Sequence, residues 1–146
     1  MGSPLGFKAF LTGTPGVERM IPMSAIDPQI IKELRELQSG GTSDFLAELI
    51  DLFLRDLALH LENMRKGLAA KDGALLLRTS HTVKGSSGNL GARGLSAIAA
   101  RLHAAVQAQD WAAAATLVAE VEREAGAVDS ELKAEKDRPG IAPSGQ

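Results

Sequence analysis

Cysteine is absent from the 146-residue chain, which excludes disulfide bonds and thiol chemistry and suits a protein of the cytoplasm. Aromatic residues contribute only 3% of the sequence, and the net charge is −2 with both signs interspersed. No basic stripe therefore indicates nucleic-acid binding. The sequence contains no apolar run long enough to indicate a membrane-spanning segment. Glycine and proline interrupt the first 22 residues, where a signal peptide would need an apolar core. We expect a cytoplasmic protein without direct contact to nucleic acid or membrane.

Glycine and proline are concentrated near the two ends of the chain. Residues 1–24 are predicted to be a flexible linker or a non-native extension, and residues 137–146 a disordered tail. The apolar residues between them are largely alanine and leucine, which favour helix. Since domains usually contain about 100–200 residues, residues 25–136 are expected to form one helical domain.

Helix signals divide this domain into five segments. Asp27 followed by Pro28 is typical of a helix start, and Asp110 is a second candidate N-cap. Apolar residues recur at steps of three and four, and nowhere with the period of two that a half-buried strand requires. The short connections predict an all-α fold, an antiparallel up-down four-helix bundle with an additional short N-terminal helix. The first helix is expected to start at Asp27, and the second to follow Thr42 or Ser43 and run to about Ala70. The third is expected to run from near Asp72 to near Leu90. The fourth carries Leu95, Ile98, Leu102 and Val106, and the fifth starts at Asp110.

The third of these helices has an apolar face and an opposite face that carries a histidine. At about 100° per residue, its core face consists of Leu76, Ser80, Val83, Ser87 and Leu90. His81 lies about 140° from the centre of that face, so its ring is predicted to point toward solvent or the rim of the bundle. Its neighbours on the outer side are Leu77, Arg78, Lys84, Gly85 and Gly88.

Two glycines on this outer side gain nothing from packing. Each interior helical glycine costs about 1 kcal/mol relative to alanine, so Gly85 and Gly88 need another explanation. Gly85 lies at i+4 from His81, where a side chain would crowd the imidazole and block a large partner. Gly88 serves either access or the packing and bending of the helix. Gly91 is predicted to end the helix in a left-handed conformation.

The histidine and its surroundings suit phosphoryl transfer. An exposed imidazole is largely neutral at pH 7 and is a competent nucleophile. Lys84, at i+3, can bring a positive charge near a group attached to the ring, and phosphoryl transfer depends on positioning and charge neutralisation. We therefore predict that His81 accepts a phosphoryl group from a docked protein. Ser86 has no base within reach and Ser87 faces the core, so structural roles are favoured for both serines.

The stretch "SHTVKGSSGNLGARGLSAIAARLHAAVQAQDW" closely resembles the signature of histidine-containing phosphotransfer (HPt) domains, His-x-x-Lys-Gly-Ser-Ser/Ala followed by Gly-Ala-x-x-Leu. The motif occupies residues 81–95, and the order of helices matches over residues 26–132. His81 matches the phosphoacceptor, Lys84 the accompanying lysine, Gly85 the access glycine and Gly91 the turn. One departure is visible, because many members have Leu-Glu where this chain has Leu102 and His103. We interpret that position as peripheral to the transfer chemistry.

The resemblance implies a four-helix bundle that carries a phosphoryl group between aspartates of response-regulator receiver domains in two-component signalling. It implies no ATP site and no kinase activity of the chain's own. The receiver would supply the aspartate and a divalent ion, expected to be Mg²⁺, so no intrinsic cofactor or metal is expected. A monomer is expected to dock a receiver through the rim around His81, with Leu77, Arg78 and Gly88. A second apolar stripe packs against the first helix or joins that docking surface; its residues are Phe45, Leu49 and Leu52.

The origin of the chain stays open. "GFKAFLTGTPG" near the start faintly resembles the closing strand of a receiver domain, although the usual lysine-proline pair is missing. The chain is therefore either a free-standing shuttle or a domain of a hybrid histidine kinase, at the cytoplasmic end of a membrane-bound protein.

Three other interpretations compete with phosphotransfer. His60, His81 and His103 have spacings that match no compact metal-ligand motif, so no metal site is expected. The dimerisation and phosphoacceptor segment of a sensor kinase normally has an acidic residue after its histidine, where this chain has Thr82. A helical module that binds a partner without carrying phosphate stays possible on sequence alone.

Overall fold

The computed structural model describes residues 25–37 and 45–137. The predictions for residues 1–24, and for the tail beyond Asp137, lie outside these ranges. The described helices are α2 (Pro28–Leu37), α3 (Phe45–Ala70), α4 (Gly73–Asn89), α5 (Arg93–Gln107) and α6 (Trp111–Asp137). The described part of the chain contains no strand, so the all-α prediction is confirmed. No helix in these ranges is long and apolar enough to cross a membrane.

Aspartates begin three of the helices. The side chains of Asp27, Asp72 and Asp110 each accept a hydrogen bond from a backbone N–H two or three residues on, at 2.9–3.1 Å. Each such cap satisfies a donor that the helix itself leaves unpaired and so stabilises the first turn. The N–H of Gln29, followed by the side chain of Arg93, holds the pKa of Asp27 below its ordinary value. This cap therefore stabilises the fold above the ordinary pKa of aspartate and is lost as the pH falls through the lower folded pKa.

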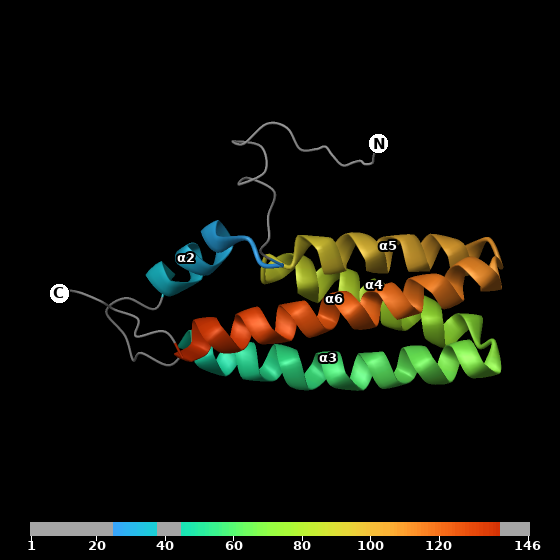
Figure 1. Ribbon diagram of the computed structural model, residues 1–146, viewed down its shortest axis with the longest axis horizontal. Coiled ribbons are helices and arrows are strands. Elements are labelled where there is room, and N and C mark those ends of the chain that lie inside the picture. Colours follow the sequence, from blue (N-terminus) through green and yellow to red (C-terminus); the bar gives the residue numbers. More distant parts are fainter. Residues whose placement is uncertain (1–24, 38–44, 138–146) are drawn as a thin grey trace, which may run out of the picture.

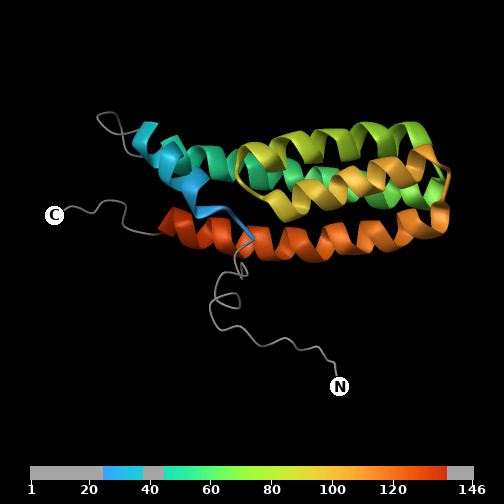
Figure 2. The same cartoon turned by 90° about the horizontal axis from the view of Figure 1, so that it is seen from above.

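The four long helices form an antiparallel ring in the order α3, α4, α5, α6, with α4 diagonally opposite α6 (Figures 1 and 2). Helices α4 and α5 are shorter than the other two: they have 17 and 15 residues, whereas α3 and α6 have 26 and 27. At 1.5 Å per residue, α3 and α6 extend roughly 15 Å further than α4 and α5. The short helix α2 packs at this end, as predicted (Figure 1).

Polar contacts hold α2 in that place. The backbone N–H of Asp27 donates to the carbonyl of Gly91 at 2.8 Å. Arg35 forms an ion pair with Glu135 of α6 at 3.0 Å. Just before α2, the carboxylate of Glu131 accepts the backbone N–H groups of residues 25 and 26. The helix is therefore tied to both the α4–α5 turn and the last turns of α6.

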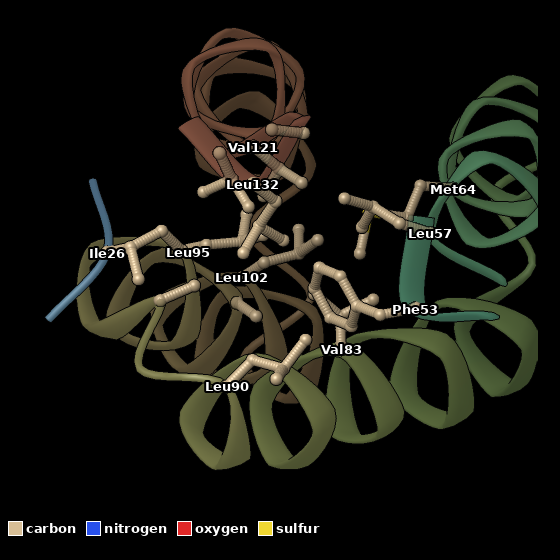
Figure 3. Packing of buried hydrophobic residues seen from close by; sticks show 14 of the residues in the cluster. Ile26, Phe53, Leu57, Met64, Val83, Leu90, Leu95, Leu102, Val121 and Leu132 are labelled. Carbon is tan, nitrogen blue, oxygen red and sulfur yellow. The ribbon is translucent and has the colours of Figure 1, made fainter. Parts of the chain in front are cut away.

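Side chains from every long helix meet along the axis of the bundle (Figure 3). The residues predicted for the core face of α4 are all buried: Leu76, Ser80, Val83, Ser87 and Leu90. The two serines are small, which lets a neighbouring helix approach α4 closely. Burial of this face determines the rotation of α4 about its own axis, and with it the direction of every residue on the opposite side.

Gly91 makes the turn between α4 and α5 possible. Its φ angle is +84°, a left-handed conformation that side chains disfavour. A Cβ at this position would lie 3.0 Å from Cβ of Ile30 on α2. The predicted left-handed ending of α4 is thus confirmed, and the close approach of α2 adds a second reason for glycine.

We predict that Gly91→Ala lowers the free energy of unfolding by at least about 1–2 kcal/mol, because the new side chain is strained in the left-handed region and meets Ile30. Gly126→Ala is the matched control. Gly126 is an exposed residue of α6, and a Cβ there would meet nothing within 4 Å. This control should raise stability by up to about 1 kcal/mol. Denaturant unfolding followed by circular dichroism measures both changes, and equal effects of the two substitutions would contradict this account of the turn.

Candidate functional site: the outer face of α4

His81 lies near the middle of α4 and is exposed. The residues before and after it on the core side, Ser80 and Val83, have no exposed surface. Their burial turns the imidazole away from the interior, as the helical wheel predicted. The ring is therefore available to a reactant that arrives from solvent.

The space beside the imidazole, over Gly85, is open. A Cβ on Gly85 would meet no heavy atom within 4 Å, the His81 ring included. The expectation that a side chain would crowd the imidazole is therefore wrong for a methyl group. Packing within the chain does not require this glycine, so clearance for a partner remains as its explanation. A Cβ on Gly88 would make an ordinary contact, 3.6 Å from Oγ of Ser96, which leaves its role undecided between access and packing.

Positive charges flank His81 on α4. Lys84 and Arg78, one turn away on either side, are both exposed. Within residues 25–37 and 45–137, no carboxylate forms an ion pair with either of them. The hydroxyl of Ser96 on α5 donates to the backbone carbonyl of Lys84 at 2.8 Å, so α5 holds this turn of α4. Both cations are thus free to meet an anionic group outside the bundle.

A second histidine lies beside the first. The ring of His103, on α5, has its centroid 6.2 Å from that of His81, and the ring planes are inclined by 53°. His103 is half-buried. The interpretation of this position as peripheral is therefore wrong. A signal for the contact exists in the sequence, because the two histidines lie equally far from Ala92 at the turn between two antiparallel helices.

A pocket of about 300 Å³ opens on the other flank of α4. Leu49, Leu52, Asp56 and His60 of α3 line one wall, and Thr82 and Ser86 of α4 line another. Thr82 follows His81 directly, so the pocket adjoins the acceptor. Sequence reasoning did not foresee this pocket, because its walls come from different helices.

Exposed apolar residues continue from this pocket along α3. Phe45, Leu52 and Leu59 are 46%, 50% and 57% exposed and recur every seven residues, which places them on one stripe of the helix. Leu49 is partly buried against the core. The interpretation of the second stripe as core is therefore wrong for Phe45 and Leu52, and the docking interpretation remains for them.

Leu77 and the two serines of this helix have surroundings that differ from those of His81. Leu77 is partly buried against the core. Ser87 is fully buried, and its hydroxyl has no hydrogen-bond partner among the described residues. The hydroxyl of Ser86 donates to the carbonyl of Thr82 at 3.0 Å. In the described ranges, no group of three or more histidine, aspartate or glutamate side chains could hold a metal ion.

Comparison with known proteins agrees with this geometry. The family model of the Hpt domain matches residues 48–133. The crystal structure of histidine-containing phosphotransfer protein B of Pseudomonas aeruginosa superimposes with a TM-score of 0.73 at 26% sequence identity, covering 80% of this chain and 98% of that one.

Two proteins of Arabidopsis thaliana are also similar. Histidine-containing phosphotransfer protein 2 is 26% identical over 104 residues, which is 69% of this chain and 67% of that protein. Histidine-containing phosphotransfer protein 5 is 39% identical over 64 residues, which is 42% of this chain and 41% of that protein.

The family match spans α3 to α6 almost completely and covers more than half of the chain. The chain therefore belongs to the Hpt domain family, whose role is histidine phosphotransfer in phosphorelay signalling.

Proposed function

We propose that His81 accepts a phosphoryl group from the aspartate of a response-regulator receiver domain and passes it to another. The observation that carries this proposal is the setting of the ring. The imidazole is exposed on a rigid helix, the surface over Gly85 is bare, and no described carboxylate pairs with Lys84.

The reaction needs little from this chain besides position and charge. A neutral ring nitrogen of His81 attacks the phosphorus, the N–P bond forms as the P–O bond to the aspartate breaks, and the electron pair of that bond returns to the carboxylate. Lys84 faces the arriving negative charge. The divalent ion, which we expect to be Mg²⁺, would be held by the receiver and neutralises charge there.

The receiver is proposed to dock over the face that joins α4 to α3. The pocket beside Thr82 and the exposed stripe of Phe45, Leu52 and Leu59 supply apolar contact area next to His81. Arg78, one turn before Thr82, borders this face from α4, and Gly88 extends the proposed contact toward Ser96 of α5. Exposed apolar residues gathered beside a reactive group are typical of an interaction surface, and a monomer would present this one unobstructed.

The parent protein and its location belong to the same proposal. We infer a cytoplasmic setting, because receiver domains are the partners, and either a free-standing shuttle or a domain of a hybrid histidine kinase. The chain would have no kinase activity of its own, since phosphoryl groups arrive on a receiver.

We predict that the chain takes label from a phosphorylated receiver and that His81→Gln takes none. The label should be lost in acid and retained in base, as an N–P bond requires. Radiolabel transfer followed by gel electrophoresis measures it, and circular dichroism checks that the variant remains folded. Equal labelling of His81→Gln would show that the acceptor is another residue. Binding of the receiver without transfer of label to the wild-type chain would support a partner-binding module. Labelling of the chain only by an ATP-binding kinase domain would support a sensor-kinase segment.

Gly85→Ala should separate stability from function. The substitution should raise the free energy of unfolding by up to about 1 kcal/mol, because it removes a glycine from a helix interior where a Cβ has open space. It should slow transfer from the receiver by about tenfold to a hundredfold, since misplacement of the reacting groups by an ångström has such an effect. Gly126→Ala should give the same gain in stability with unchanged transfer. If Gly85→Ala transfers at the wild-type rate, the access role of this glycine is wrong.

Leu52→Glu should weaken docking of the receiver. A carboxylate in the centre of an apolar contact loses burial and remains partly desolvated, so the transfer rate at low receiver concentration should fall about tenfold or more. The leucine is half exposed, so the fold should persist. Ala119→Glu, on the exposed side of α6 away from α4, should have no effect. Transfer assays quenched at short times, over a range of receiver concentrations, should show a higher apparent KM for Leu52→Glu than for Ala119→Glu. Equal transfer rates for the two variants would show that α3 is not part of the docking surface.

A further inference from the structure

We propose that His103 is a second binding group for the phosphoryl group carried on His81, donating a ring N–H to one of its oxygens. The inference rests on the proposed function, because it assumes that His81 is the acceptor. Its starting observation is the contact between the rings, whose centroids lie 6.2 Å apart.

The separation suits a phosphoryl oxygen that reaches from the edge of the His81 ring toward the ring of His103. Two imidazoles with centroids 6.2 Å apart cannot form a direct hydrogen bond, because even nitrogens aimed at each other would be further apart than the usual 2.7–3.2 Å. A phosphoryl group bonded to a ring nitrogen of His81 would carry oxygens beyond the edge of that ring, within reach of the neighbouring imidazole. The inclination of 53° also means that the rings are not stacked face to face, so an edge N–H of His103 can be directed at such an oxygen.

The position of His103 on α5 directs it toward α4. Leu102, next to it, is fully buried in the core. On the other flank of Leu102, Arg101 extends to Glu120 of α6, with which it forms an ion pair at 3.5 Å. Residues two apart on a helix lie on nearly opposite flanks. The half-buried His103 therefore lies on the side of α5 that faces α4.

The charges around the pair favour an anion. Arg78 and Lys84 lie one turn away on α4. On α5, the residues one turn from His103 are uncharged: Ala99, Ala100, Val106 and Gln107. On α3, across α4, the pocket adds Asp56 and His60, while α6 is diagonal to α4 and its Glu120 is engaged by Arg101. The arrival of a phosphoryl dianion therefore makes the protonated form of His103 more favourable, since hydrogen bonds between charged partners are the strongest ones.

Both charge states of the second imidazole can serve transfer. A neutral ring still has one N–H to donate, and a protonated ring adds a positive charge. His103 forms no covalent bond in this scheme. The N–P bond to His81 and the P–O bond to the receiver's aspartate remain the only bonds made and broken.

Nuclear magnetic resonance of the full chain with ¹⁵N-labelled histidine tests this inference. Phosphoramidate, a small phosphoryl donor, replaces the receiver so that docking does not contribute. At a fixed pH near 7, the ratio of protonated to neutral His103 should rise about threefold to tenfold on phosphorylation, the size of one charge-assisted contact at a partly exposed site. His60, on α3 across α4, should change less than His103, because the pocket side of α4 separates it from the proposed contact. His81→Gln treated in the same way should show no change at His103.

Two substitutions distinguish a phosphoryl contact from ring packing. His103→Gln keeps an N–H donor without the charge, and His103→Phe keeps the ring without a donor. Relative to wild type, the fraction phosphorylated at a fixed phosphoramidate concentration should fall about threefold to tenfold in His103→Phe and less in His103→Gln. Wild-type occupancy in His103→Phe, with an unchanged His103 signal in the phosphorylated wild-type chain, would overturn the inference. Failure of His81 to take any label would instead refute the proposed function, so the two failures are distinguishable.

Discussion

Burial of one face of α4 is the constraint on which the rest of the site depends. Leu76, Ser80, Val83 and Ser87 have no exposed surface, so the helix cannot rotate about its axis without exposing apolar area and opening the α4–α5 contact. Each fully buried aliphatic side chain contributes about 1.5–3 kcal/mol. A rotation that moved His81 inward would therefore lose several kcal/mol. The exposure of a single imidazole is thus maintained by packing on the opposite side of the helix.

The glycines of this helix illustrate two different physical demands on the same residue type. Gly91 has a positive φ angle and lies against Ile30, so the fold itself requires it. Gly85 has open space around it and an ordinary helical conformation, so the isolated chain does not require it. A helix interior ordinarily disfavours glycine by about 1 kcal/mol. The explanation that we propose for Gly85 is a partner surface that approaches the helix backbone at this position.

Helices α3 and α5, which pack on either side of α4, contribute different features to the surroundings of His81. Helix α3 contributes apolar area and the pocket that adjoins Thr82, which suits the recognition of a protein. Helix α5 contributes Ser96, which holds the backbone at Lys84, and His103, which lies beside the acceptor ring. In the proposed scheme, recognition and phosphoryl binding lie on opposite flanks of the same helix, and a change on one flank need not disturb the other.

Much of this arrangement follows from local sequence, because helix periodicity and capping act over a few residues. The apolar steps of three and four, the aspartates at helix starts and the wheel of α4 were sufficient for the five helices, the bundle, the outward direction of His81 and the left-handed turn at Gly91. Contacts between helices could not be predicted from local sequence. The exposure of Phe45 and Leu52, the pocket beside Thr82 and the position of His103 depend on how far each helix extends, on where α2 packs and on the register between α4 and α5. Those quantities are set by side chains distant in sequence that pack together, so only the tertiary structure decided them.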